Sequence, residues 1–189
     1  MQNHPPPRSA AELSAGLAEI AASPRDRGLV RMIVRRPQVE TRETLTDAEL
    51  SVTEGLVGDS WRERVLQKSP SGVADPETQL TLMNARAAQL VAQAEQRWPL
   101  AGDQLYVDLD LSGENLPTGT RLSVGGALLE ITAKPHTGCK KFVERFGMDA
   151  MLFVNSPEGR RLNLRGIYAR VLQAGRVRVG DRVEKTPTR

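Results

Sequence analysis

The feature that most constrains the fold is a series of short apolar runs separated by turns rich in glycine and proline. Asp103 to Leu111 alternates apolar and polar residues with a period of two, which is typical of a half-buried strand. Arg121–Val124 and Ala127–Thr132, joined by Gly125 and Gly126, have the form of a β-hairpin with a two-residue turn. About seven such runs occur, so we predict a mainly β (α+β) fold, a barrel or sandwich with peripheral helices.

The same signals assign the remaining elements. We predict further strands over Gly28–Arg36, Gln79–Met83 and Leu164–Ala174, and a final hairpin within Arg176–Val183. Helices are predicted after the capping box that Ser9 begins, over Thr46–Thr53, and over Ala85–Arg97 with Asn84 as cap. Met148–Asn155 is either a helical turn or a strand, and Gln67–Thr78 and Ser156–Arg161 are predicted loops.

Composition bounds the class of protein. With 189 residues we expect one domain, with residues 1–27 as a tail and short helix, 28–185 as the domain and 186–189 as a tail. A net charge of +3 is too small to require a nucleic-acid partner. A single cysteine excludes an intramolecular disulfide and a zinc ribbon. No apolar run of about 18 residues and no signal peptide are present, so we expect a cytoplasmic protein without a membrane segment.

The stretch from Pro135 to Phe146 holds the only cysteine, Cys139, and one of the two histidines, His136. The apolar spacing of Phe142, Val143 and Phe146 predicts a helix that begins near Cys139. A helix N-terminus with Lys140 and Lys141 nearby would stabilise the thiolate, which is the nucleophilic and metal-binding form. A buried and inert cysteine is the alternative, and both interpretations stay open.

Two other segments carry polar side chains beside tight turns. Gly55 to Trp61 places two glycines around two apolar residues, then an acid and an indole, which indicates a tight turn beside something bulky. Ser112 to Pro117 is a loop that carries Glu114 and Asn115, and ordinary turn stabilisation is the simplest role for both.

Taken together, five segments in this order resemble the MOSC family, the C-terminal domain of molybdenum cofactor sulfurase, in its small stand-alone bacterial type. They are Gly55-Leu56-Val57-Gly58-Asp59, Gln79-Leu80-Thr81-Leu82-Met83, Gly113-Glu114-Asn115-Leu116, His136-Thr137-Gly138-Cys139-Lys140-Lys141-Phe142, and Arg165-Gly166-Ile167-Tyr168-Ala169-Arg170-Val171 continuing to Val179-Gly180-Asp181. The resemblance covers about Gly28 to Val183 and implies a MOSC-type β-barrel with peripheral helices. It also implies that the chain binds the molybdenum cofactor (molybdopterin), a pterin whose dithiolene holds the metal; pyridoxal phosphate binding is associated only with the family as a whole.

The resemblance implies roles for particular residues. Cys139 would be the molybdenum ligand or would carry a sulfur atom, and His136 would donate to an oxo ligand or transfer a proton, unless it only fixes the turn. The cofactor's phosphate would bind to cations, for which the candidates are Lys140, Lys141, Arg160, Arg161 and Arg165. The pterin edge would bind to Asn84, Glu114 and Asn115, for which turn stabilisation is the competing role.

Three functions remain open. The first is a molybdenum-dependent reductase of N-hydroxylated substrates such as hydroxylamines, amidoximes or base analogues. It would act with an external flavin or iron–sulfur reductase, because one cysteine holds no intrinsic iron–sulfur cluster and no flavin module is expected. The second is a persulfide sulfur carrier for metal–sulfur cluster or cofactor assembly through Cys139. The third is a non-catalytic basic barrel that binds an anionic partner through Arg31, Arg35 and Arg36. Leu13, Leu17 and Ile20 form an apolar stripe for packing or for a homodimer contact.

Overall fold

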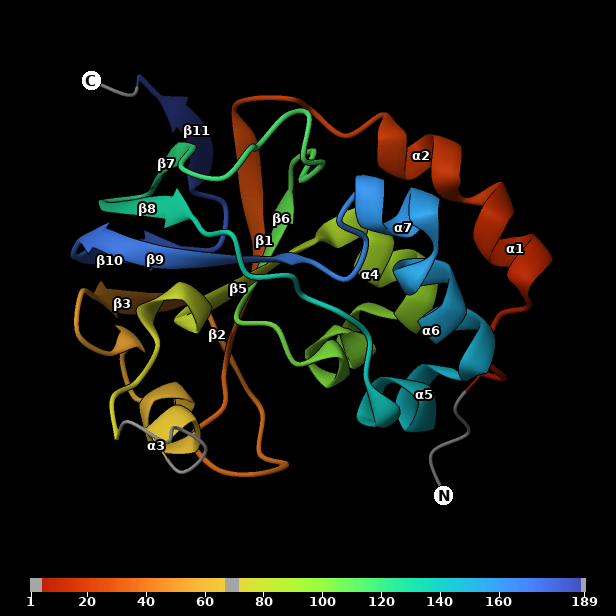
Figure 1. Cartoon of the computed structure of the whole chain (residues 1–189), viewed down its shortest axis with the longest axis horizontal. Coiled ribbons are helices and arrows are strands. Elements are labelled where there is room, and N and C mark those ends of the chain that lie inside the picture. Colours follow the sequence, from red (N-terminus) through yellow and green to blue (C-terminus); the bar gives the residue numbers. More distant parts are fainter. Residues whose placement is uncertain (1–4, 67–71, 188–189) are drawn as a thin grey trace.

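In the computed structural model, which describes residues 5–66 and 72–187, seven strands close into a mixed β-barrel (Figure 1). The ring runs in the order β11, β7, β8, β9, β5, β6, β1 and closes by pairing of β1 with β11. Its strands are β1 (Gly28–Arg35), β5 (Leu80–Asn84), β6 (Leu105–Asp108), β7 (Arg121–Val124), β8 (Ala127–Ile131), β9 (Ile167–Gln173) and β11 (Arg182–Thr186). The barrel architecture, rather than a sandwich, is therefore confirmed.

Strand directions alternate around the barrel except at one place. β5 and β6 are parallel, and the chain crosses between them through α4 (Ala85–Ala92) and the 3-10 helix η2 (Glu95–Ala101). β2 (Glu43–Leu45) pairs with β1 beside the ring. A separate three-stranded sheet contains β3 (Asp47–Ser51), β4 (Gly55–Leu56) and β10 (Gly175–Arg178).

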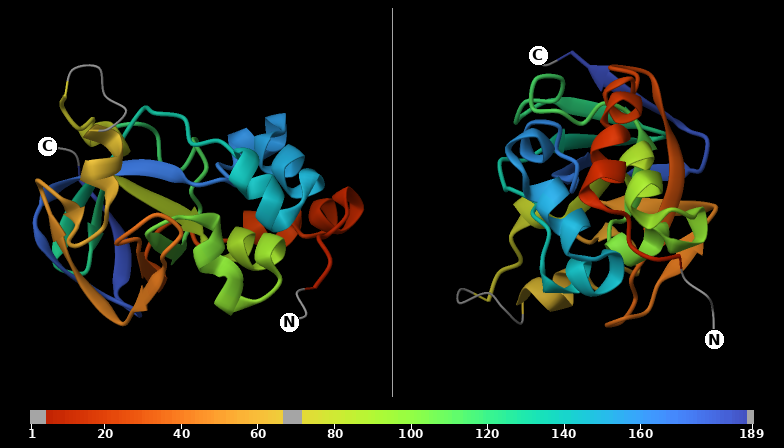
Figure 2. Two further views of the ribbon diagram at one scale, coloured as in Figure 1. Left: turned by 90° about the horizontal axis from the view of Figure 1, so that it is seen from below. Right: turned by 90° about the vertical axis from the view of Figure 1, so that its right-hand side faces the viewer.

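Most helices gather on one side of the barrel (Figures 1 and 2). They are α1 (Ala10–Ala15), α2 (Leu17–Ala21), α4, η2, α5 (Lys140–Phe146), α6 (Met148–Asn155) and α7 (Pro157–Arg161). α3 (Trp61–Leu66) lies apart from this group, and the short 3-10 helix η1 (Pro76–Thr78) precedes β5.

Two hydrophobic cores hold these layers together. Ile33, Leu82 and Val107 belong to the core inside the barrel, whereas the neighbouring residues Val34 and Met83 belong to the core between the barrel and the helices. Successive residues of a strand face opposite sides, so these strands are apolar on both faces. The second core also contains Leu13 and Ile20, with Leu17 packed against it, so the N-terminal apolar stripe packs within the chain.

The local signals for helix ends are confirmed in detail. Ser9 and Glu12 form the predicted capping box at the start of α1. The side chain of Asn84 accepts hydrogen bonds from two backbone amides of α4, and Cys139 is the N-cap residue of α5. The predicted hairpin is β7 and β8, whose register pairs Val124 with Ala127.

The prediction of a helix over 46–53 is wrong, because this segment is the strand β3. Ala48 and Leu50 are buried while Glu49 is exposed, which is the period of a strand with one buried face. β3 also pairs with β10, and so the predicted final hairpin is wrong as well, since β10 and β11 belong to different sheets.

The remaining differences concern helix lengths. The predicted loop over 156–161 contains the helix α7, with Ser156 as cap and Pro157 in the first turn. The helix predicted to reach Arg97 ends at Ala92, because Gln93 adopts a left-handed conformation with φ of 66°. The segment left open between helix and strand, Met148–Asn155, is the helix α6.

Parts of the predicted tails and of the predicted loop over Gln67–Thr78 fall on residues 1–4, 67–71 and 188–189, which lie outside the described residues. Within the described ranges, no helix has the length and apolar character needed to cross a membrane.

Candidate functional site

A pocket of about 1100 Å³ opens where the loop after β1, α3, the segment around η1, α5 and β9 come together. Its lining is rich in cations and also holds the chain's single thiol. The cationic residues are Arg36, Arg42, Arg64, Lys141, Arg145 and Arg165, and the lining also includes Glu40, Trp61, His136, Cys139 and Tyr168. This composition suits an anionic ligand.

Four of the residues proposed from the sequence line this pocket: His136, Cys139, Lys141 and Arg165. Cys139 is exposed and its thiol makes no hydrogen bond to the amides of α5, although it begins that helix. The preceding Gly138 is tightly enclosed, since a Cβ there would lie 3.2 Å from Asn155 and Val154. The turn that presents the thiol is therefore fixed by close packing against α6.

The other proposed residues do not line the pocket. Asn84 is buried and donates to Ser23 Oγ at 2.8 Å and to the carbonyl of Leu109 at 2.7 Å. Lys140 and Arg160 are exposed on α5 and α7. Arg161, also exposed, pairs with Glu158 at 2.6 Å.

Glu114 and Asn115 likewise contact residues outside the pocket. Glu114 pairs with Arg25 at 3.1 Å on the surface. Asn115 is buried and donates to the carbonyls of Arg25 and Asp110, while its side-chain oxygen accepts from Lys185 at 3.0 Å. These contacts tie the segment before β1 to β11 and to the loop after β6, which is the turn-stabilising role.

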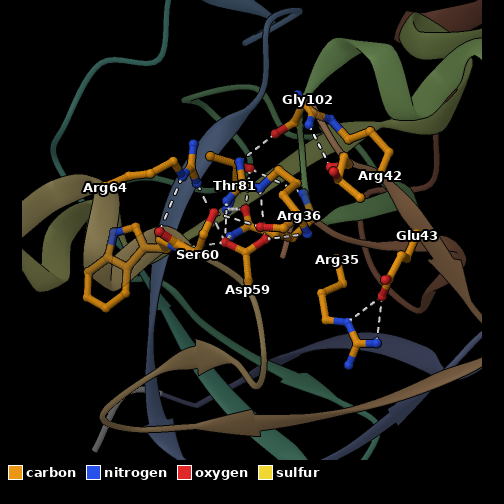
Figure 3. A network of polar contacts seen from close by, with 12 residues as sticks. Arg35, Arg36, Arg42, Glu43, Asp59, Ser60, Arg64, Thr81 and Gly102 are labelled. Carbon is orange, nitrogen blue, oxygen red and sulfur yellow. Dashed lines mark hydrogen bonds and ion pairs between the residues drawn. The ribbon is translucent and has the colours of Figure 1, made fainter. Parts of the chain in front are cut away.

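One wall of the pocket is built on a buried ion pair that the sequence did not reveal. Arg36 and Asp59 form two hydrogen bonds, each of 2.9 Å, between guanidinium and carboxylate (Figure 3). Arg36 also donates to the carbonyl of Gly102 at 2.6 Å, and Asp59 accepts from the backbone of Trp61 at 2.9 Å. This bidentate pair joins the end of β1 to the start of α3.

Two further arginines surround this pair (Figure 3). Arg64 lies 3.5 Å from Asp59, and burial together with the like charge of Arg36 lowers its pKa below the ordinary value. Burial and the charges of Arg145 and Arg36 also lower the pKa of Arg42, whose buried Nε has no hydrogen-bond partner among the described residues. Cations held this close together favour binding of an anion.

A contact on the pocket lining joins the loop after β1 to α5. Glu40 forms ion pairs with both Lys141 and Arg145, and the pair with Arg145 is 2.5 Å long. Glu40 adopts a left-handed φ of 63°, which is unusual for a residue other than glycine. Hydrogen bonding to Lys141 and the charge of Arg145 lower the pKa of the Glu40 carboxyl.

A second buried group of ionisable side chains adjoins the pocket. Nδ1 of His136 lies 3.6 Å from Oδ1 of Asp103, and Oδ2 of Asp103 accepts from Arg165 at 2.7 Å. The His136 ring lies against the Tyr168 ring, with 4.6 Å between centroids. Burial, with the charges of Arg165 and Arg36, lowers the pKa of His136 well below its ordinary value. Burial raises the pKa of Asp103, and the same two arginines oppose this change.

Comparison with known proteins places this architecture in a family. The model of the MOSC domain family matches residues 73–184, more than half of the chain. The chain belongs to the MOSC domain family. No curated protein sequence gives a match to it.

Two solved structures that share the fold of this chain are distant from it in sequence. The YuaD protein from Bacillus subtilis is 15% identical with a TM-score of 0.62, and the alignment covers 86% of this chain and 97% of that one. YiiM from Escherichia coli is 18% identical with a TM-score of 0.54, over 85% of this chain and 71% of that one. At such identities the likeness shows the fold alone.

The matched MOSC region contains only part of the pocket. The lining residues His136, Cys139 and Arg165 lie within residues 73–184, as does Asp103, the buried partner of Arg165. The lining residues Arg36, Arg42 and Arg64 precede that region, as does Asp59, the buried partner of Arg36. The available sequence signal for these preceding residues was Asp59 after Gly58, an acid beside a tight turn. Asp103 gave no separate signal because it was assigned to the alternating strand.

Proposed function

We propose that this MOSC protein binds the molybdenum cofactor in the pocket and reduces N-hydroxylated compounds with electrons from an external reductase. The observation that supports the proposal best is the joint presence of a cation-lined pocket and the chain's only thiol on its lining. Membership of the MOSC family, which is associated with this cofactor, supports it independently.

The residues fit the chemistry of the cofactor. Its phosphate is an anion, and Arg42 and Arg64 are paired incompletely within the chain, Arg42 having a buried Nε without a partner among the described residues. Its pterin carries amide and amine groups, for which the hydroxyl of the lining residue Tyr168 is a suitable hydrogen-bond partner. Its molybdenum is a soft metal, for which the thiolate of Cys139 is a suitable ligand.

The proposed phosphate partners therefore differ from most of those expected from the sequence. Lys141 and Arg165 line the pocket, but Lys141 is paired with Glu40 and Arg165 with Asp103. Arg42 and Arg64, which stand near the Arg36–Asp59 pair, have more unused donors. We assign the phosphate to these two side chains.

When bound, the cofactor supplies a metal that accepts an oxygen atom and exchanges two electrons. The net reaction takes an N-hydroxylated amine, two electrons and two protons to the amine and water. The chain's own contribution is to bind the cofactor's anionic groups, to hold the Cys139 thiolate at the pocket and to orient the substrate. An external reductase supplies the electrons, since a single cysteine provides no iron–sulfur cluster.

The sulfur-carrier function is the second candidate, and one observation favours it. Cys139 is exposed and its side chain does not cap the helix, so a persulfide there would be open to an acceptor protein. The third function, a basic barrel that binds an anionic partner, has less support. Arg36 is buried with Asp59, and Arg35 is paired with Glu43 at 2.6 Å.

The first experiment measures molybdenum and pterin in protein purified from a host that makes the cofactor. Wild type is compared with Cys139→Ser and Arg42→Ala, and Arg160→Ala serves as the matched control because Arg160 is an exposed arginine outside the pocket. We expect near-stoichiometric cofactor in wild type and in Arg160→Ala, loss of turnover in Cys139→Ser, and at least a tenfold weaker cofactor affinity in Arg42→Ala, as expected for loss of one charge-assisted contact.

The opposite results are equally informative. If wild type contains no pterin, even after incubation with free cofactor, the reductase function is rejected. A mass increase of one sulfur atom on Cys139, without bound metal, would then identify the carrier function.

A further inference from the structure

His136 lies beside the carboxylate of Asp103, a residue that has no part in the proposed reductase function. Nδ1 of His136 lies 3.6 Å from Oδ1 of Asp103, and neither atom has a hydrogen-bond partner among the described residues. The Asp103 side chain is fully buried and that of His136 is 10% exposed. The separation is longer than a good hydrogen bond, but both atoms are buried and each requires a polar partner.

The contact made by Oδ2 of Asp103 determines the ionisation state of the carboxylate, and therefore whether Oδ1 can donate a hydrogen bond. Oδ2 accepts from Arg165 at 2.7 Å, and Arg165 also donates to the carbonyl of Ala101 at 2.8 Å. A guanidinium remains charged in a protein, so a buried Arg165 retains Asp103 as its counter-ion. An ionised carboxylate only accepts hydrogen bonds. The hydrogen between the two residues must therefore be on Nδ1 of His136.

Burial favours the neutral ring, and the like charges of Arg165 and Arg36 act in the same direction. Tyr168 lies against the ring, and the charge of Asp103 is balanced by Arg165. A neutral imidazole with its hydrogen on Nδ1 has a lone pair on Nε2. Nε2 makes no hydrogen bond to any part of the chain that the structure describes, and His136 lines the pocket.

We propose that Asp103 is a positioning residue that fixes the Nδ1–H tautomer of His136, so that Nε2 accepts a hydrogen bond from an N–H or O–H group of the bound substrate. Six lining residues carry guanidinium or ammonium donors. The two lining carboxylates are already paired, Glu40 with Lys141 and Arg145, and Asp75 with Lys134. An accepting nitrogen in this setting selects ligands with a donor. The proposed hydrogen bond from substrate to Nε2 rests on the proposed reductase function, because the hydroxyl of an N-hydroxylated compound is such a donor. The proposed tautomer of His136 does not rest on that function.

The tautomer can be measured on protein without cofactor. The chain has two histidines, so His4→Gln leaves His136 alone in a long-range proton–nitrogen correlation spectrum. We expect a neutral ring with the proton on Nδ1 at pH 7. In His4→Gln with Asp103→Asn, the amide oxygen turns to Arg165, which only donates, and the amide nitrogen faces His136. We expect the tautomer to invert in that variant, as an aspartate-to-asparagine change does in a catalytic triad.

Specific results overturn the proposal. A charged ring at pH 7, or the Nε2–H tautomer in His4→Gln, rejects it directly. An unchanged tautomer in the Asp103→Asn variant rejects the role of Asp103. Because His4→Gln replaces none of the described lining residues, the measurement on it remains decisive if Asp103→Asn does not fold.

The proposed hydrogen bond to the substrate has its own test in the loaded enzyme. Glutamine at position 136 places an amide oxygen near the position of Nε2, whereas asparagine places it near Nδ1. We expect KM to rise about tenfold in His136→Asn, the effect of one lost hydrogen bond, and less than about threefold in His136→Gln. Equal KM values in the two variants overturn the proposed hydrogen bond to the substrate and leave the tautomer result unaffected. Failure to load cofactor rejects this hydrogen bond together with the reductase function, and the spectrum of the cofactor-free protein separates the two cases.

Discussion

Two buried polar groups of this molecule differ in how completely they are satisfied. Asn84 and Asn115 use both side-chain atoms, with the nitrogen donating to two partners in each case and the oxygen accepting from the chain. At the pocket, by contrast, His136, Asp103 and Arg165 each keep a buried atom without a hydrogen-bond partner among the described residues. Complete satisfaction indicates a structural role, whereas ionisable groups that are incompletely satisfied beside a pocket indicate a functional one.

The largest expected effect concerns the ion pair that supports the pocket wall. Asp59→Ala leaves Arg36 buried, with a charge that lacks its partner, so we expect the free energy of unfolding to fall by about 3–5 kcal/mol in urea denaturation. Glu43→Ala breaks the matched but partly exposed pair with Arg35 and should cost less than about 1 kcal/mol. Equal losses would show that burial does not distinguish the two pairs.

The next effect separates structure from function at Asn84. Asn84→Ala removes a helix cap and leaves two buried partners unpaired, so we expect a loss of about 2–3 kcal/mol in unfolding free energy. Cofactor content measured on the folded fraction should stay at the wild-type value. A variant that remains stable but loses cofactor would contradict the comparison and return Asn84 to the binding site.

A smaller effect follows from His136. The folded protein keeps this ring neutral because its pKa is lowered, whereas the unfolded chain protonates it below its ordinary pKa of about 6.5. The unfolded state therefore binds more protons as pH falls through that value, and stability present above it is lost below it. Between about pH 7.5 and pH 5.5, wild type should lose about 1 kcal/mol more unfolding free energy than His136→Gln. Parallel pH profiles for the two proteins would contradict the lowered pKa.

The smallest effect concerns the ion pairs that Glu40 forms on the pocket lining. Glu40→Gln removes a negative charge beside Lys141 and Arg145, so an anionic thiol reagent should modify Cys139 faster in low salt. The difference from wild type should shrink as salt is added, because exposed charges are screened. Glu144→Gln, at an exposed acid on the same helix α5, is the control. A salt-independent difference would indicate a steric effect of the loop instead.

The fold was largely predictable because its signals are local. The Gly125-Gly126 turn and the caps at Ser9, Asn84 and Cys139 each depend on neighbouring residues, and each is found in the structure. The alternation in 103–111 correctly predicted a strand, which is β6, but the prediction that this strand is half-buried is wrong, because Leu105, Tyr106 and Val107 are all buried. The helix predicted over 46–53 is wrong because a short run with polar ends is compatible with either a helix or a strand. Its pairing with β10, far along the chain, decides the matter.

The site was only partly predictable for a related reason. His136, Cys139, Lys141 and Arg165 belong to short motifs, and all of them line the pocket. The wall of Arg36, Asp59 and Arg64 joins segments whose proximity is created only by the folded barrel. Asn84 and Asn115 have side chains suited to binding, but their partners in the chain already occupy every donor and acceptor, and no sequence pattern shows that.

Closure of the barrel by β1 and β11 has a consequence for how the protein is made. Gly28 pairs with Val183, so the pairing of β1 with β11 can form only after β11 has left the ribosome. Contacts between such distant segments form slowly, and until they form β1 has an open edge during synthesis. We expect the ligand pocket to mature only after β11 has been translated, and the open edge of β1 to be exposed to aggregation until then.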